Sequence, residues 1–190
     1  MRKKLMEAGI ACLNEFGYGA VTMQRVTDKA EVSRGAFLHH FPTRIDLMLA
    51  VAEYAATQQN AFVANKLREV TNAEALYEAL TMTTWSAMLQ PPAIALLEIM
   101  MGARSDPELL KTLPKVVDSL QSQQMEDVWM IAERIGIKDR ETVLTMVRLH
   151  VAAMRGLVLE GMYSKDSEAI ENAMSLLVKY KEQLTKDLRK

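Results

Sequence analysis

Residues 22–46 read TMQRVTDKAEVSRGAFLHHFPTRID, and this stretch decides the fold of the N-terminal part of the chain. A short amphipathic segment, 23–30, leads through a brief turn into a second segment, 33–40. Thr22 and Ser33 precede the two segments, where a hydroxyl accepts a hydrogen bond from an unpaired N–H of the first helical turn. Two short helices joined by a tight turn form the helix-turn-helix layout.

The second segment has the polarity of a helix that faces DNA. It carries Arg34, His39 and His40 with little acid of its own. Basic side chains of this kind pair with phosphates, and an arginine also reaches base edges in the major groove.

A further set of residues in and around this region occurs in a recognisable order: Gly17-Tyr18, Thr22, Val26, Ala30, Val32-Ser33, Gly35, His40-Phe41, Arg44 and Leu47. This order resembles the N-terminal DNA-binding domain of the TetR family of transcription regulators. The matching residues cover roughly the first quarter of the chain. The remainder resembles the family in its helical pattern and its length.

Three residues depart from the family pattern. Glu31 occupies a turn position where the family usually has glycine, and a left-handed non-glycine residue there costs about 1 kcal/mol. Leu38 replaces a usual tyrosine whose hydroxyl in the family often reaches phosphate, and Thr27 replaces a usual alanine. These departures affect detailed contacts more than the fold.

The resemblance and the residue chemistry together predict a DNA-binding surface. Its expected members are Thr22, Arg34, Gly35, Ala36, His39, His40 and Arg44. Arg34 is the candidate base reader, because a guanidinium binds guanine O6 and N7 with two hydrogen bonds. The resemblance places Ala36 at the groove floor and Gly35 where the backbone approaches DNA closely.

The other members of this set are expected near the DNA backbone. Thr22, His39 and Arg44 are predicted to contact phosphates, Thr22 and Arg44 from positions near helix N-termini. His40 matches a family position that touches phosphate or braces the domain. For each of these residues the alternative is an ordinary solvated polar side chain.

Apolar spacing predicts an all-α chain of about nine helices. An N-terminal three-helix domain containing the helix-turn-helix is joined by a long helix to a helical body. The expected helices are 2–16, 23–30, 33–40, 44–70, 73–89, 93–104, 107–134 (kinked or divided at Pro114), 139–162 and 166–188. We assign DNA binding to residues 1–46, and effector binding and dimerisation to residues 47–190.

Charge and composition agree with this division. The 190 residues are 49% hydrophobic, enough for a real core, and the net charge is -1. Residues 1–46 hold seven Lys/Arg against five Asp/Glu, so the N-terminal end is mildly basic. No apolar run approaches the ~20 residues of a membrane helix, and the single Cys12 has the spacing of a buried apolar residue. We therefore expect a cytoplasmic protein that does not bind membranes.

The body between residues 82 and 162 is rich in methionine and holds both tryptophans. Methionine suits surfaces that accommodate varied apolar ligands, and the resembling family has its effector pocket in this region. The predicted ligand-binding residues are Met82, Trp85, Met88, Met100, Arg104, Met125, Trp129, His150 and Met154. Plain core packing is the alternative for each of them, and for His150 it is the commoner role.

The last two helices predict a homodimer surface. Residues at helical spacing on the first are Val143, Val147, Val151, Met154 and Val158, beside the small residues Ala152, Ala153 and Gly156. The matching stripe on the second is Ile170, Ala173, Leu177, Leu184 and Leu188. Two such helices from each of two chains form a four-helix interface. The alternative is that both stripes pack inside one chain.

Enzyme functions find no support in the sequence. Three histidines and one cysteine are scattered, without an HExxH, CxxC, nucleophile-elbow, P-loop or dinucleotide motif. We expect no catalytic residues, no metal site and no cofactor.

These observations predict a ligand-responsive transcriptional regulator, with repression as the family-typical direction. It is expected to bind a palindromic operator in double-stranded DNA as a homodimer and to respond to a small apolar effector. The alternative is a helical small-molecule-binding or protein-interaction module without specific DNA binding, which Glu31 and Leu38 keep open.

Overall fold

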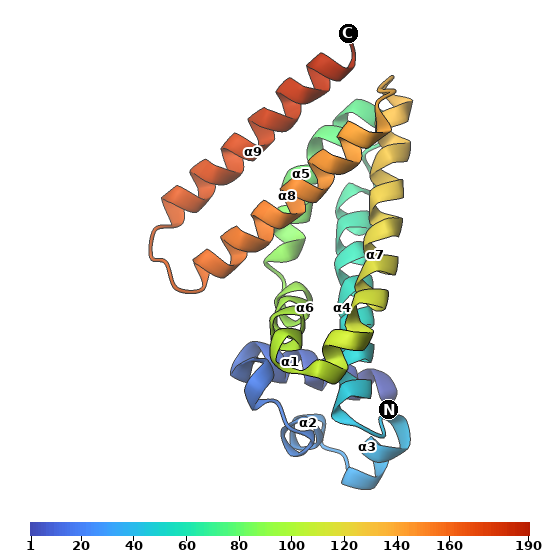
Figure 1. Ribbon diagram of the computed structural model, residues 1–190, viewed down its shortest axis with the longest axis vertical. Helices are drawn as coiled ribbons and strands as arrows, with labels where there is room; N and C mark the ends of the chain where they lie inside the picture. The colour runs from blue at the N-terminus through green and yellow to red at the C-terminus, as the bar shows by residue number, and fades with distance from the viewer. The chain divides into compact units, whose positions relative to one another are not determined.

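The computed structural model describes residues 1–190, except for the side chain of Leu120. The helices in chain order are α1 (Arg2–Ala20), α2 (Met23–Ala30), α3 (Arg34–His40), α4 (Arg44–Leu67), α5 (Ala73–Met88), α6 (Pro91–Gly102), the 3-10 turn η1 (Ala103–Ser105), α7 (Pro107–Arg134), α8 (Arg140–Gly161) and α9 (Ser167–Leu188) (Figure 1). The described part of the chain contains no strand, so the predicted all-α fold of about nine helices is confirmed.

Short-range hydrogen bonds begin the helices where the sequence predicts. Thr22 Oγ1 accepts from the N–H of Arg25 at 3.2 Å, and Ser33 Oγ accepts from the N–H of Ala36 at 3.1 Å. The same bond, to the N–H three residues ahead, caps α5, α8 and α9 through Asn72, Asp139 and Asp166. Each cap pairs a donor that the helix itself leaves unpaired.

Glycine and proline act on the helices in three ways. Gly17 has φ 70° and ψ 165°, so α1 is kinked there and ends one short stretch later at Ala20. Pro91 opens α6 in its first turn, where a missing N–H costs nothing. Pro114 leaves α7 undivided, contrary to one of the two expected outcomes. Pro114 is exposed, so water reaches the carbonyl of Leu110 that its ring leaves unpaired.

The chain divides by its contacts into two compact units. Unit 1 comprises residues 1–61 and 90–121, and unit 2 comprises residues 62–89 and 122–190. Helices α4 and α7 each contribute residues to both units. The boundary that we expect between residues 46 and 47 separates the DNA-binding part from the effector-binding and dimerisation part. It is a division by function and not by contacts, and it stays a prediction.

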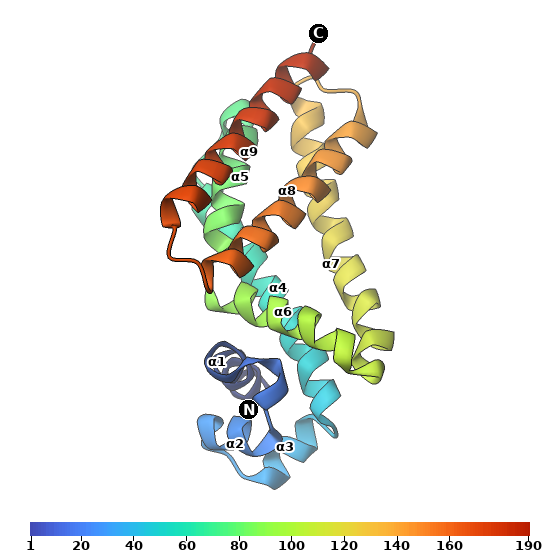
Figure 2. The ribbon, with the colours of Figure 1, turned by 60° about the vertical axis from the view of Figure 1, so that its left-hand side comes forward.

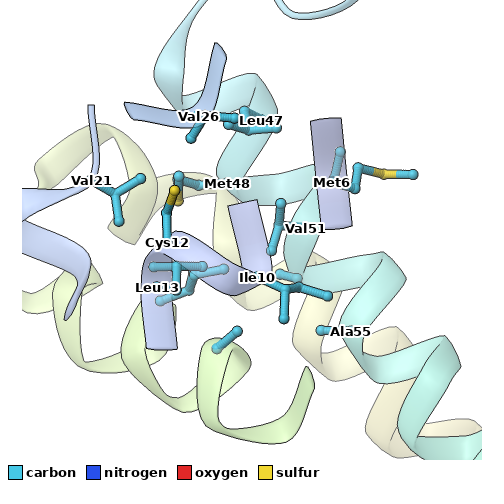
Figure 3. Packing of buried hydrophobic residues seen from close by; sticks show 14 of the residues in the cluster. Met6, Ile10, Cys12, Leu13, Val21, Val26, Leu47, Met48, Val51 and Ala55 are labelled. Atoms are coloured by element: carbon cyan, nitrogen blue, oxygen red, sulfur yellow. The ribbon is translucent and has the colours of Figure 1, made fainter. Parts of the chain in front are cut away.

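The core of unit 1 is built around α1. Helices α2 and α6 pack against α1, and α3 packs against α2 (Figure 1). The side chains of Cys12 and Leu13 lie among Val26 of α2 and Met48 and Val51 of α4 (Figure 3). Cys12 is fully buried, as its spacing predicts, and burial raises the pKa of its thiol.

Two aromatic side chains anchor the recognition segment to this core. Phe37 and Phe41 are fully buried, with ring centroids 6.0 Å apart in a tilted arrangement. They therefore serve as core and are not available to stack on DNA. Because the side chain of Phe37 is buried in the core of unit 1, the opposite side of α3 faces outward.

In unit 2, α8 and α9 lie side by side as a helical hairpin, and α5 packs against both (Figure 2). The buried centre of this unit includes Tyr77 of α5, Ala132 of α7 and Val143 and Val147 of α8. Val158 is buried as well. These valines of the α8 stripe pack inside one chain, so for them the internal alternative is right and the dimer assignment is wrong.

By length and composition alone, α8 is the one described helix that could by itself cross a membrane. The sequence of α8 has no long unbroken apolar run, but its average hydropathy is high because its charged residues are few and spread along the helix. Val143, Met146 and Val147 of α8 are buried in the core of unit 2.

Candidate functional site

The turn between α2 and α3 has the geometry that usually selects glycine. Glu31 adopts φ 50° and ψ 49°, the only left-handed non-glycine residue in the described chain. The N–H of Val32 donates to the carbonyl of Thr27 at 3.0 Å and closes the end of α2. The expected strain of about 1 kcal/mol at Glu31 is therefore present. Lys4 lies 3.7 Å from the Glu31 carboxylate, an exposed pair that contributes little.

The substitution at Thr27 is accommodated locally. Its side chain is buried, and Oγ1 donates to the carbonyl of Gln24 at 2.8 Å. The hydroxyl is thus satisfied within α2, and the helix keeps its packing against α1.

Helix α3 presents its N-terminal end to solvent. Arg34 is exposed, and within the described chain it has no hydrogen-bond or ion-pair partner. Gly35 is exposed too, and a Cβ built there would meet only Ser33 Oγ at 3.9 Å. Ala36 is half-buried beside them. A free guanidinium next to an open backbone surface is what close approach to a major groove requires.

The C-terminal end of α3 carries two histidines and one leucine. His39 is exposed and His40 half-buried, with ring centroids 5.1 Å apart in an edge-on arrangement. Leu38 is 40% exposed, an apolar side chain where the family usually has tyrosine. Thr22, at the start of α2, is also exposed, but its hydroxyl already accepts the capping bond.

The start of α4 is fixed by a reciprocal capping box. Asp46 Oδ2 accepts from the N–H of Thr43 at 2.9 Å, and Thr43 Oγ1 accepts from the N–H of Asp46 at 3.1 Å. Aspartate thus fills the position usually taken by glutamate or glutamine. This box holds Arg44 at the first turn of α4.

The guanidinium of Arg44 is engaged within unit 1. It donates from Nε to the carbonyl of Val21 at 2.9 Å, and from Nη2 and Nη1 to the carbonyl and hydroxyl of Tyr18 at 2.6 and 3.0 Å. Its Cζ also lies 4.1 Å from the centroid of the Tyr18 ring. The phosphate contact predicted for Arg44 stays a prediction, but the structure gives this side chain a bracing role.

Tyr18 extends this brace to the junction of α6 and α7. Its hydroxyl donates to Asp106 Oδ2 at 2.7 Å, and its N–H donates to Glu98 Oε2 at 2.9 Å. Burial of the ring, reinforced by the Asp106 hydrogen bond, raises the pKa of Tyr18 to about 12. The same hydrogen bond lowers the pKa of Asp106.

A glycine on α6 makes room for the Tyr18 ring. A Cβ built on Gly102 would lie 2.2 Å from ring atoms of Tyr18. The sequence did not reveal this cluster, because Tyr18 and Asp106 lie far apart in the chain and Asp106 reads only as a helix cap. That cap is present: Asp106 Oδ1 accepts from the N–H of Leu109 at 3.2 Å.

Unit 2 holds a pocket between α5, α7, α8 and α9, here named the α5–α9 pocket. Its empty space is about 390 Å³, solvent at its mouth included. Its apolar walls are Leu80, Val128, Met146, Val147, Val151 and Met154, and its neutral polar residues are Thr81, Thr84 and Gln124. His150 and Lys181 complete the lining. The mostly apolar lining is that of a small-molecule site, and its methionines can move to admit a ligand.

His150 lies in the wall of this pocket with both ring nitrogens engaged. Nδ1 is 2.9 Å from the carbonyl of Met146, and Nε2 is 3.0 Å from the carbonyl of Leu177. The commoner role foreseen for this residue, a satisfied buried histidine, is therefore the one that the geometry favours. It joins α8 to α9 along the pocket.

The predicted ligand-binding residues are only partly brought together. His150 and Met154 line the α5–α9 pocket, whereas Met125 and Trp129 pack against the core of unit 2. Met82 is exposed, Trp85 is half-buried and Met88 is buried, all on α5. Met100 packs on the core of unit 1, where Arg104 is exposed. For the residues outside the pocket, ligand binding stays a prediction.

Lys181 is the pocket residue that the sequence did not single out. It is 6% exposed, its Nζ donates to the carbonyl of Tyr77, and it lies 4.2 Å from the centroid of the Tyr77 ring. Burial lowers its pKa to about 8, opposed by the charge of Glu78. One lysine in an amphipathic helix looks solvated in sequence, so no local signal pointed to it.

Comparison with known proteins identifies the N-terminal domain. Residues 5–51 match the family model described as bacterial regulatory proteins of the tetR family. These residues are a TetR-family domain. The comparisons support a TetR-family transcriptional regulator, which agrees with the expectation that the chain is not an enzyme.

Relatives and solved structures extend the likeness beyond the TetR-family domain. The chain is 26% identical to the HTH-type transcriptional regulator CymR of Pseudomonas putida over 171 residues, 88% of this chain and 82% of that protein. It is 37% identical to the HTH-type transcriptional repressor AcnR of Corynebacterium diphtheriae over 70 residues, 36% of this chain and 37% of that protein.

The fold is shared along the whole chain. The TetR-family regulator SCO4454 of Streptomyces coelicolor superposes with a TM-score of 0.74 at 17% identity, covering 100% of this chain and 96% of that one. A transcriptional regulator from Saccharomonospora viridis, solved in complex with choline, gives 0.71 at 16% identity, with 95% of each chain covered.

Proposed function

We propose that this TetR-family regulator is a ligand-responsive repressor that binds a palindromic operator as a homodimer. The observation that carries the proposal is the end of α3, where Arg34 is exposed without a partner beside the open backbone of Gly35. Both helices of the motif are held by side-chain caps, so this end is presented on a rigid support. The AcnR relative is a repressor, which supports repression as the direction.

Base reading is assigned to α3, and backbone contacts to its surroundings. Arg34 reads a guanine, Gly35 and Ala36 line the approach, and Thr22 and His39 contact phosphates. Arg44 holds α4 against Tyr18, and its phosphate contact stays a prediction. Leu38 lies on the exposed side of α3, where its apolar side chain can contact the methyl group of a thymine.

The dimer surface proposed is the outward side of α8 and α9. Leu149, Leu176 and Tyr180 are large apolar side chains with exposed fractions of 63%, 47% and 62%. Nothing lies within 4 Å of a Cβ built on Gly156, so α8 is open to close approach there. Association of two copies through these sides buries the exposed side chains and gives the two-fold symmetry that a palindromic site mirrors.

The α5–α9 pocket is proposed as the effector site. The choline-bound structure from Saccharomonospora viridis shows that a protein with this fold can hold a small molecule. Half-sites on B-DNA require recognition helices about 34–36 Å apart, so a ligand that changes this spacing releases the operator.

Selection of the purified protein against random duplex DNA at physiological salt tests the proposal. An inverted repeat should be enriched, and Arg34→Ala should relax preference at one position of each half-site. Arg68→Ala, which removes an exposed arginine outside the motif, is the matched control. Absence of any enriched sequence, with only weak salt-sensitive binding, would contradict DNA recognition and favour the alternative of a helical binding module.

The dimer is tested separately by sedimentation velocity at micromolar concentration. Leu149→Arg should convert dimer to monomer, whereas Met82→Arg, at an exposed methionine on α5, should leave the dimer intact. A wild-type chain that sediments as a monomer would contradict the proposed assembly.

A further inference from the structure

The charge of the α5–α9 pocket defines the chemistry of its ligand. No aspartate or glutamate is among the described residues that line it, and its side chains able to carry charge are His150 and Lys181. The rest of the lining is apolar or neutral. A site of this kind offers a ligand one positively charged end and an apolar remainder.

Lys181 is a buried cation with weak internal compensation. Its Nζ donates to the carbonyl of Tyr77 and faces the Tyr77 ring, and no carboxylate in the described chain lies within ion-pair distance. A carbonyl and an aromatic face offset only part of the hydration that an ammonium loses on burial. A methionine or leucine would fill this position without that loss, so the amine is better explained by a ligand than by packing.

The surrounding charges do not supply the missing partner. Glu78 of α5 is exposed and acts on Lys181 only at a distance. A second groove to which Lys181 also contributes is lined by Glu78, Glu182, Lys186 and Arg189, and both glutamates are exposed. The lining of the α5–α9 pocket itself contributes no carboxylate.

His150 brings no carboxylate to the pocket. Its two ring nitrogens lie within hydrogen-bond distance of the carbonyls of Met146 and Leu177, so the ring is held between α8 and α9. Lys181 is then the residue that sets the charge of the lining.

We propose that the effector is an organic acid, an apolar molecule with a single carboxylate that pairs with Lys181 inside the α5–α9 pocket. This inference rests on the proposed effector role of the pocket and names the class of ligand that it takes. The carboxylate accepts hydrogen bonds from the Lys181 ammonium, and the hydrocarbon part lies against Met146, Val151 and Met154. Cationic ligands are disfavoured by the Lys181 ammonium.

Matched probe pairs test the proposal on the full-length protein. Octanoate is compared with octanamide, and phenylacetate with phenylacetamide, so that each pair differs only in the acidic head. Binding is followed by tryptophan fluorescence and by thermal unfolding. The wild-type protein should bind each acid about tenfold or more tightly than its amide, the preference expected for one charge-assisted hydrogen bond in a buried site.

The variant Lys181→Met removes the amine and keeps the shape of the side chain. It should lose the preference for acids and still bind the amides, whereas Lys179→Met, at an exposed lysine on the same helix, should behave as wild type. Equal binding of acid and amide by the wild-type protein, or a preference that survives in Lys181→Met, overturns the proposal and leaves the pocket assignment intact. If no member of either pair binds, the pocket assignment fails as well; the DNA selection is independent of both.

A second measurement needs no variant. Pairing with a carboxylate favours the protonated amine, so octanoate binding at pH 9 should take up protons. Calorimetry in two buffers of different ionisation enthalpy measures this uptake. Octanamide should show none, and octanoate binding without proton uptake overturns the pairing with Lys181.

Discussion

Replacing Arg44 by methionine separates a bracing role from a DNA contact. Methionine keeps part of the hydrocarbon stem and removes the guanidinium that joins α4 to Tyr18 and Val21. We expect Arg44→Met to destabilise unit 1 by about 3 kcal/mol, working from the contacts that disappear.

The magnitude follows from the geometry of the brace. Three hydrogen bonds, at 2.6, 2.9 and 3.0 Å, end on two carbonyls and one hydroxyl. Hydrogen bonds to a charged group contribute about 1.5–3 kcal/mol when buried, but the Arg44 side chain is 30% exposed, so about 1 kcal/mol each is appropriate. The cation–π contact adds about 0.5 kcal/mol, and the 3.6 Å pair with Asp106 adds little in water.

Urea unfolding followed by far-UV circular dichroism measures the loss. Both tryptophans lie in unit 2, so their fluorescence follows that unit and serves as an internal comparison. With a slope of about 2 kcal/mol per molar urea, the midpoint of unit 1 should fall by about 1.5 M. Arg68→Met, at an exposed arginine, should shift neither signal.

The salt dependence of DNA binding gives the refuting result. A lost phosphate contact lowers the slope of log K against log salt by about 0.9. If Arg44→Met lowers that slope and leaves the urea midpoint of unit 1 unchanged, Arg44 is a DNA contact and the brace is energetically unimportant. An unchanged slope with a lower midpoint supports the brace.

Four further substitutions have definite expected outcomes. Gly35→Ala should keep or slightly raise stability, since a Cβ there has room, yet weaken operator binding about tenfold or more in a gel-shift titration. Glu31→Gly should raise the free energy of unfolding by about 0.5 kcal/mol in urea, because it relieves left-handed strain at some cost in chain entropy. Gly102→Ala should lower it by about 2 kcal/mol, because the new methyl meets the ring beneath it at 2.2 Å. Lys181→Met should raise the free energy of unfolding at pH 7 by as much as about 3 kcal/mol, because folding lowers the pKa of the lysine from 10.5 to about 8. The cost of burying the wild-type ammonium is full below pH 8 and vanishes as pH rises to 10.5. The melting temperatures of the two proteins should therefore converge between pH 8 and pH 10.5.

Local chemistry accounts for the features that the sequence predicted well. A cap needs only a hydroxyl three residues before an N–H, so Thr22 and Ser33 could be placed without knowledge of the rest of the chain. The left-handed turn at Glu31 followed from its position in the motif. Burial of Cys12 followed from helical spacing.

Long-range pairing accounts for what the sequence could not supply. Periodicity shows that Val143 and Val147 share a side of α8, but not whether that side meets the same chain or another. Arg44 reads as a solvated cation until Tyr18 and Asp106 are brought beside it. Lys181 required Tyr77, more than a hundred residues earlier in the chain, to appear as a buried amine.

The interleaving of the two units has a consequence for synthesis of the protein. Residues 1–61 leave the ribosome long before residues 90–121, which complete the same unit with Glu98 and Asp106. A nascent chain carrying α1 to α3 thus lacks the partners of Tyr18 until α6 and the start of α7 are made. A chimera that exchanges unit 2 must be joined at three points, two of them inside the continuous helices α4 and α7.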